Sequence, residues 1–455
     1  MNACDYKTKN VLMSVFWLLA IVHFVQSVVK HLSILDLDII LSFFEALVFS
    51  SLIIIGALYI YRNKKALRYF VSKDNILLIL LFLLLVLSCV IRTFSSETNY
   101  IDSNLAELRE FIYLILYFNL GKISAEYGLR NVVVRSLHFI LITITAFMAF
   151  VIYLTMINEE IVTSRGGLIG MRYGYALEVN CNPNYVGASA MVLFLLCISM
   201  VIWYRKRRSV VIVYSICSVI HFVVLILSNS RTALAATIVG VSCIAGLVTF
   251  SILYKKDVKG KLRISSEIAI LTGEITFSMR YIITNMYSLI VMFFNGFGFM
   301  IKEFTPEEVL NASTRLDIWG YCFRILFESP LIFGLTPAGI ADPLIECDIS
   351  LVANPHSHNI VLEMGLAVGI PGMILFVIWL LLIAKRCILV LKTRPLDLDV
   401  MVISFLILAM VVDNMFERYV LFYGYFISYI FFFLCGYISY YGEKMGSNWK
   451  LNHID

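Results

Sequence analysis

Long apolar stretches separated by short polar segments run along the whole chain. Each stretch holds about 20 residues, which as a helix is long enough to span the hydrocarbon core of a bilayer. The pattern therefore predicts a polytopic helical membrane protein. We expect twelve helices, over residues 11–29, 39–61, 75–94, 105–123, 134–157, 184–204, 209–228, 231–254, 277–300, 358–383, 399–416 and 419–441.

The predicted fold class is all-α, with residues 1–455 forming a single integral membrane domain. Two long outer loops are expected, at 158–183 and 301–357. In the second loop, Thr314 and Asp317 have the spacing of a capping box, and apolar residues at helical spacing follow as far as Pro330. We expect a short interfacial helix there, in which Trp319 is either a membrane anchor or part of a site.

Composition agrees with this class, since 60% of the residues are hydrophobic and only 15% are charged. The net charge of +5 comes from lysines and arginines in alternate loops, which predicts that these loops and both termini are cytoplasmic. The charge thus reports topology and gives no indication of nucleic-acid binding. The basic clusters are Arg62–Lys73, Lys122–Arg135, Arg205–Arg208, Lys255–Arg263 and Lys385–Arg394.

Several arginines fall on the predicted outer side, although lysines and arginines otherwise gather in the predicted cytoplasmic loops. Arg231 opens a helix after a very short turn, and Arg315 lies in the first turn of the expected interfacial helix. An arginine held at the membrane surface is costly unless it meets a partner or a ligand. Arg231 is therefore a candidate binding residue, with an ion pair to Asp413 or Glu417 as the structural alternative.

A polar segment that leads into a long apolar helix carries two histidines. Asn354 is a candidate N-cap, and Pro355 suits the first helical position. His356 and His358 would then lie in the first turn, beside the positive end of the helix dipole. That position disfavours imidazolium, so a histidine there stays neutral and able to accept a proton. A purely structural polar cap is the alternative.

The chain resembles the O-antigen ligase and O-antigen polymerase superfamily of bacterial membrane glycosyltransferases, from about residue 170 to 420. The ligase pattern of histidine and two later glycines is matched by His358-Asn359, Gly369 and Gly372, but not from His356, where Ala367 replaces the required glycine. The segments that carry the resemblance are Arg172–Asn184 with its Asn-Pro-Asn, Ser230-Arg231-Thr-Ala, Arg315–Trp319 with Pro330 and Gly334, and Asn354–Gly372.

The resemblance implies transfer of a glycan, with inversion, from an undecaprenyl-diphosphate-linked oligosaccharide to an acceptor sugar hydroxyl. Arg231 and Arg315 would hold the diphosphate through their planar guanidinium groups. His358 would be the general base. No cofactor or metal is implied. Further candidates for contacts with the substrate or the arginines are Arg172, Asn182, Asn184, His356, Asn359, Asp413, Glu417 and Arg418.

The implied location is the bacterial inner membrane, with the site facing the periplasm and contacts to other polysaccharide-assembly proteins. The acceptor would be another lipid-linked glycan, for a polymerase, or the core sugar of lipopolysaccharide, for a ligase. We prefer the polymerase because such members are abundant.

Three alternatives stay open. A metal-dependent glycosyltransferase would use an acidic pair such as Asp36 and Asp38, although the same tripeptide recurs at Asp397–Asp399 near the inner face. A transporter or lipid-linked-oligosaccharide flippase would also have many helices, but such proteins usually show internal repeats and charge near the bilayer midplane. A structural or sensory protein would have no need of outer arginines beside a histidine.

Two cysteines, Cys181 and Cys347, fall in the two large outer loops. If the motif segments converge on one site, these loops approach each other there, and an oxidising compartment would favour a disulfide. Two free thiols are the preferred alternative, because nothing in the sequence brings the two Cα atoms within bonding range.

Overall fold

The computed structural model describes most of the chain beyond residue 70. The described ranges are 71–95, 101–126, 130–156, 161–162, 168–172, 176–179, 183–255, 313–328, 332–346, 356–393, 398–422 and 426–451, with a few isolated positions elsewhere. The predicted helices at 11–29, 39–61 and 277–300, and both Cys181 and Cys347, lie outside these ranges.

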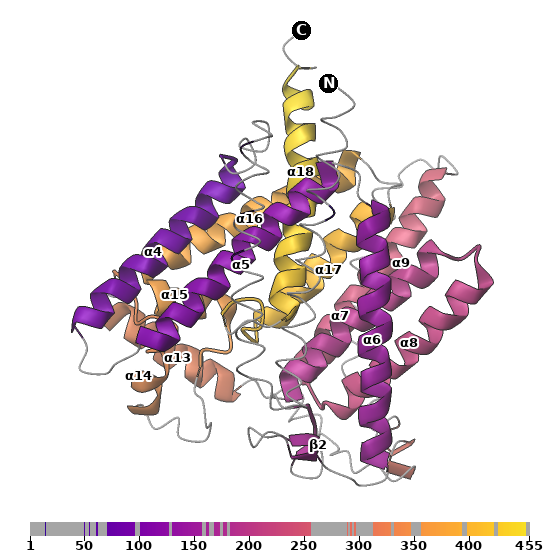
Figure 1. Ribbon diagram of the computed structural model, residues 1–455, viewed down its shortest axis with the longest axis horizontal. Helices are drawn as coiled ribbons and strands as arrows, with labels where there is room; N and C mark the ends of the chain where they lie inside the picture. The colour runs from indigo at the N-terminus through magenta and orange to yellow at the C-terminus, as the bar shows by residue number, and fades with distance from the viewer. Residues whose placement is uncertain are drawn as a thin grey trace.

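The described part is predominantly helical, as predicted (Figure 1). Most of the expected helices occur within a few residues of their predicted bounds. The helices are α4 (Lys73–Ser95), α5 (Ile101–Glu126), α6 (Arg130–Met156), α7 (Pro183–Trp203), α8 (Arg208–Leu227), α9 (Arg231–Lys255), α13 (Ser313–Glu328), α14 (Ala341–Glu346), α15 (Ile360–Val368), α16 (Ile370–Thr393), α17 (Leu398–Asn414) and α18 (Phe426–Leu451).

The helices pack in two groups joined by α17. In one group α18 lies along α5 and α16, and α4 packs against α5 and α16. In the other group α7 packs against α8 and α9, and α6 packs against α8. Helix α17 contacts α9 and α7 on one side and α18 on the other, so it connects the groups (Figure 1).

Glycines allow α5 and α18 to approach each other closely. A Cβ at Gly436 would collide with the carbonyl oxygen of Phe118, and one at Gly121 would collide with that of Phe433. Backbone is thus packed on backbone at both positions, where only glycine fits. This tight pair forms the centre of the first helix group.

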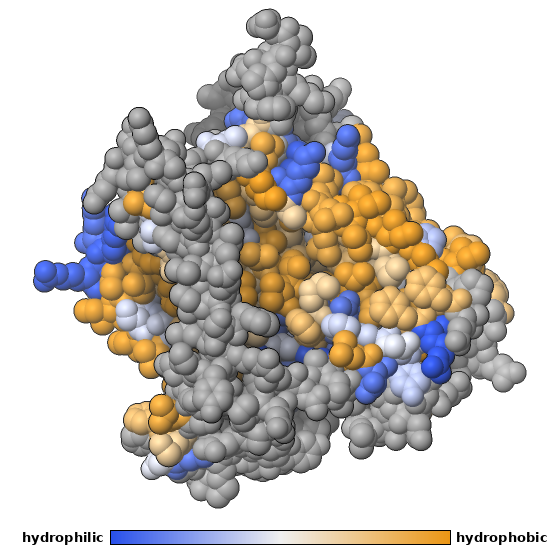
Figure 2. Space-filling view, turned by 180° about the vertical axis from the view of Figure 1, so that it is seen from behind, coloured by the Kyte–Doolittle hydropathy of each residue, from blue (hydrophilic) through white to orange (hydrophobic). Residues whose placement is uncertain are grey.

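Among the described helices, four are long and apolar enough to cross a membrane, namely Lys73–Phe94, Pro183–Trp203, Arg208–Leu227 and Ile370–Leu391. Three shorter apolar helices, Leu141–Met156, Arg231–Gly246 and Val400–Asn414, accompany them. Figure 2 shows a broad apolar area on the side where α4 and α16 lie, with hydrophilic residues gathered at its margins. The helical membrane class is confirmed, whereas the number of twelve spans stays a prediction.

Some local structure differs from the expectation. The helix expected at 358–383 is divided at Gly369, whose φ of 88° interrupts the helical backbone. Residues 158–183, expected as a loop, contain a three-stranded antiparallel sheet of β1 (Ile161–Val162), β2 (Leu168–Arg172) and β3 (Ala176–Val179). Its register pairs Ile161 with Ile169 and Arg172 with Ala176. These strands are too short to give a clear alternation of polar and apolar residues.

Candidate active site

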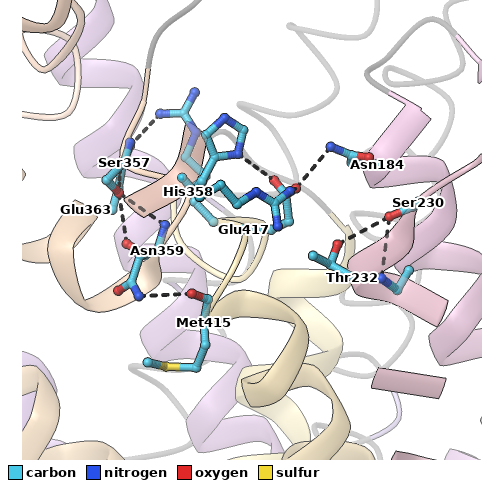
Figure 3. Close-up of polar contacts among 12 residues, drawn as sticks. Asn184, Ser230, Thr232, Ser357, His358, Asn359, Glu363, Met415 and Glu417 are labelled. Atoms are coloured by element: carbon cyan, nitrogen blue, oxygen red, sulfur yellow. Dashed lines mark hydrogen bonds and ion pairs between the residues drawn. The ribbon is translucent and has the colours of Figure 1, made fainter. Parts of the chain in front are cut away.

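A buried carboxylate, Glu417, joins three of the predicted site residues. Its Oε1 accepts hydrogen bonds from Arg315 Nη2 at 2.7 Å and from Asn184 Nδ2 at 3.0 Å. Its Oε2 lies 3.2 Å from His358 Nδ1. The Glu417 side chain has no exposed surface, whereas those of Arg315 and His358 are 22% and 12% exposed. We call Asn184, Arg315, His358 and Glu417 the Glu417 cluster; Figure 3 shows Asn184 and His358 reaching Glu417 from opposite sides.

The four residues of the Glu417 cluster come from segments far apart in the sequence. Asn184 lies in the first turn of α7, directly after Pro183, a residue suited to a helix start. Arg315 lies in the first turn of α13, His358 two residues before α15, and Glu417 just after α17. Helix α15 packs against α16 and α4 of the first helix group, whereas α7 belongs to the second. The Glu417 cluster therefore forms where the two groups meet.

The start of α15 differs from the prediction in a way that determines the orientation of His358. The N-cap is Asn359, not Asn354, because its side chain accepts hydrogen bonds from the backbone N–H groups of Val361 and Leu362 at 2.9 and 3.1 Å. His356 and His358 therefore precede the helix and do not lie in its first turn. With its φ of 48°, His358 turns the chain and places its ring at Glu417.

A second buried carboxylate, Glu363 of α15, supports the loop that carries Glu417. Its Oε1 lies 2.5 Å from Arg418 Nη1, and its Oε2 accepts hydrogen bonds from the Ser357 hydroxyl and backbone N–H at 2.6 and 3.1 Å. Asn359 Nδ2 also donates to the carbonyl of Met415 at 2.9 Å (Figure 3). The residues on both sides of Glu417 and His358 are thus fixed to α15.

These contacts show what three of the candidate residues touch within the chain. Arg418 and Asn359, predicted as substrate contacts, are engaged in holding the loop and capping α15. Trp319, considered as a membrane anchor, donates its indole N–H to the Ser357 carbonyl at 3.0 Å and so packs against the site.

The charge state of Glu417 follows from its neighbours. Burial by itself raises the pKa of this carboxyl, but the hydrogen bond from His358 and the charges of His358, Arg315 and His356 together outweigh burial. The net pKa lies below the ordinary value of 4.5, so Glu417 is ionised at neutral pH. An ionised Glu417 accepts the Nδ1–H of His358 and leaves Nε2 of that ring with a lone pair.

The other predicted residues surround the Glu417 cluster to different degrees. His356 is buried, and its ring centroid lies 3.8 Å from that of His358. Asp413 is buried at the end of α17, near enough to Glu417 and Arg315 to interact with their charges. Arg231 is exposed as the first residue of α9, and Ser230 before it accepts a hydrogen bond from Ala233 N–H at 3.4 Å. Arg172 ends β2, and Asn182 lies outside the described residues.

One group of side chains in the described part has the composition of a metal site. A ring nitrogen of His356, a ring nitrogen of His358 and a carboxylate oxygen of Glu417 all lie within 4.8 Å of one another. This group overlaps the Glu417 cluster. The acidic pair Asp36 and Asp38, considered from the sequence as a metal site, lies outside the described residues.

Residues 216–377, a little over a third of the chain, match the family model described as O-antigen ligase. The match includes Arg231, Arg315 and His358, and it confirms the predicted resemblance to the O-antigen ligase and polymerase superfamily. This family implies glycosyl transfer onto or from lipid-linked glycans in polysaccharide assembly, in a membrane. No curated protein and no solved structure matches the chain.

Proposed function

From the O-antigen ligase segment of the chain we propose that this protein transfers a glycan from undecaprenyl diphosphate to an acceptor sugar hydroxyl at the outer face of the bacterial inner membrane. The observation that carries the proposal is the Glu417 cluster. It combines a histidine oriented for proton transfer with an arginine, and both His358 and Arg315 lie within the matched family segment.

His358 is the general base in this mechanism. The acceptor oxygen attacks the anomeric carbon of the donor, and the bond from that carbon to the phosphate oxygen breaks with its electron pair leaving on the diphosphate. The hydroxyl proton passes to Nε2 of His358, because Nδ1 faces Glu417. Glu417 fixes the tautomer and the orientation of the ring and stabilises the imidazolium that forms. Attack on the side opposite the leaving group gives inversion.

The leaving diphosphate needs fixed positive charge. The guanidinium of Arg315 has five N–H donors, and its bond to Glu417 occupies only one of its nitrogens. Arg231 is exposed at the start of α9, where the helix N-terminus adds to its positive charge. These two arginines bind the diphosphate in the proposed mechanism, and the charges are supplied without a metal ion.

The site's surroundings suit an acceptor sugar. Asn184 and Asp413 border the Glu417 cluster and offer hydrogen-bonding groups for sugar hydroxyls. We assign Arg172, the last residue of β2, to the same outer surface. With both termini cytoplasmic, the α7, α13 and α15 N-terminal ends face the periplasm together.

A transfer assay with purified protein tests this function. The protein is reconstituted in vesicles with an undecaprenyl-diphosphate oligosaccharide, and products are separated by size, with and without a lipopolysaccharide-core acceptor. Polymerase activity gives a ladder from the donor alone, and ligase activity gives product only with the core. EDTA should leave the rate unchanged. The metal-free mechanism is wrong if EDTA stops transfer and magnesium or manganese restores it.

A further inference from the structure

His356 occupies a position that the transfer mechanism leaves unexplained. Its side chain is buried and its ring lies 3.8 Å from the ring of His358, with an angle of 34° between the two planes. Two imidazole rings beside a carboxylate are a set of donors that zinc binds well.

The geometry of these three side chains suits a tetrahedral ion. Ligand atoms about 2.1 Å from a tetrahedral zinc are separated from each other by about 3.4 Å. His358 Nδ1 and Glu417 Oε2 lie 3.2 Å apart. A ring nitrogen of His356, a ring nitrogen of His358 and a carboxylate oxygen of Glu417 all lie within 4.8 Å of one another. Rotation of the His356 ring out of its stack with His358 would bring the three ligand atoms around one ion. The set of two histidines and one glutamate leaves a fourth position for water.

The charges nearby determine which ion can bind. Arg315 bonds to Oε1 of Glu417, so a cation would bind at Oε2, and the positive guanidinium lowers its affinity. Magnesium and calcium prefer oxygen ligands and gain little from two imidazoles. Zinc binds imidazole strongly enough to displace the proton shared between His358 and Glu417. The site therefore discriminates against magnesium and calcium.

We propose that His356, His358 and Glu417 form an inhibitory binding site for Zn²⁺. The bound ion takes the Nδ1 lone pair of His358 and an oxygen of Glu417, which removes the hydrogen bond that orients the ring. The proton of the neutral ring then sits on Nε2, so this nitrogen has no lone pair to accept the hydroxyl proton in transfer. The inhibitory role rests on the proposed transfer function, whereas zinc binding itself does not. His356 contributes to the ion site and accepts no proton in transfer.

Zinc binding and zinc inhibition are measured separately. Equilibrium dialysis of the purified wild-type protein should give one tightly held Zn²⁺ per chain, and zinc in the transfer assay should inhibit with the same midpoint. EDTA should restore the rate, and magnesium at the same concentrations should have no effect. His356→Ala should weaken zinc binding at least tenfold and make its own residual transfer rate insensitive to zinc at the wild-type midpoint.

His138→Ala is the matched control, because His138 packs against Tyr204 and Tyr214 and has no part in the Glu417 cluster. It should bind zinc and be inhibited like the wild type. Zinc that binds the His356 variant as tightly as the wild type, or that activates transfer, would overturn the inference. A protein that binds zinc through His356 but transfers no glycan would retain the site and refute the proposed function instead.

Discussion

At the scale of single residues, the site depends on two side chains held in unfavourable surroundings. His358 has a φ of 48°, and a non-glycine residue in the left-handed region costs about 1–2 kcal/mol. Glu417 is an ionised group without exposed surface. A left-handed backbone and the burial of a charge are each unfavourable by themselves, although the partners of Glu417 outweigh its burial. Both are explained if the ring and the carboxylate must meet at the junction of the helix groups.

Glu417→Gln should reveal the coupling of this carboxylate to stability. Folding lowers the pKa of the Glu417 carboxyl. Such a group stabilises the folded state at pH values above its pKa in the unfolded chain, and this stabilisation is lost as the pH falls through its pKa in the folded protein. The variant should therefore unfold at a lower temperature than the wild type at pH 7, and the difference should shrink below about pH 4.5. Thermal unfolding in detergent from pH 7 to pH 3.5 measures it. A difference independent of pH would contradict the assignment.

At the scale of elements, the short helix α15 organises the site. It ends at Gly369, and its last carbonyls are satisfied by a neighbouring loop: Leu335 N–H donates to Leu366 at 2.7 Å, and Thr336 N–H donates to Ala367 at 3.0 Å. Gly334 begins this contact with a φ of 70°. The loop thus closes one end of α15 while Asn359 caps the other, which fixes the positions of His358 and Glu363.

Gly334→Ala should disturb this arrangement. A Cβ at Gly334 would collide with the backbone of Ala367, and the φ of 70° is unfavourable for alanine. We expect the thermal unfolding temperature and the transfer rate to fall together. Gly320→Ala in α13 is the control, because a Cβ there meets nothing within 4 Å and alanine favours a helix by about 1 kcal/mol. Equal behaviour of the two variants would show that the loop does not position α15.

The sequence predicted these elements unevenly. The apolar runs indicated α4 to α9 and α17 within a few residues, because hydrophobic length and helix length are directly related in a membrane protein. The division at Gly369 was not predicted, since the residues on both sides are apolar and continue the helical pattern. The cap was misplaced for a related reason: Asn354-Pro355 and Asn359 are both good helix starts in the sequence. The structure shows that it is Asn359 that accepts hydrogen bonds from the backbone N–H groups of Val361 and Leu362.

At the scale of the whole molecule, two polar clusters occupy opposite ends of the first helix group. The Glu417 cluster lies at one end. At the other, Lys122 is buried between Glu443 at 2.9 Å and Asp74 at 3.9 Å, and Arg386 lies 3.5 Å from Asp74. These four residues connect α4, α5, α16 and α18 near their predicted cytoplasmic ends. The sequence had placed Lys122 in a basic loop, because its partners are distant in the chain and only the fold brings them together.

The contacts within the candidate site were likewise not predictable from the sequence alone. His358, Arg231 and Arg315 were identified by resemblance to the family. The two arginines were also identified independently, because arginines in membrane proteins normally gather on the cytoplasmic side and these two lie on the predicted outer side. The central role of Glu417 could not be predicted, because a carboxylate after α17 pairs with Asn184 and Arg315 only when α7 and α13 meet. Sequence patterns indicate which residues can bind a substrate or transfer a proton. Tertiary packing determines which of these residues contact one another.

The transfer rate of His358→Asn tests the central claim most directly. Asparagine tolerates a positive φ better than most residues, so the variant should fold as well as the wild type while lacking a base. With purified proteins and saturating donor, we expect a loss of about 10²–10⁴-fold in rate, and no loss for His138→Asn, whose side chain packs on Tyr204 and Tyr214. A folded His358→Asn protein that transfers glycan at the wild-type rate would contradict the account.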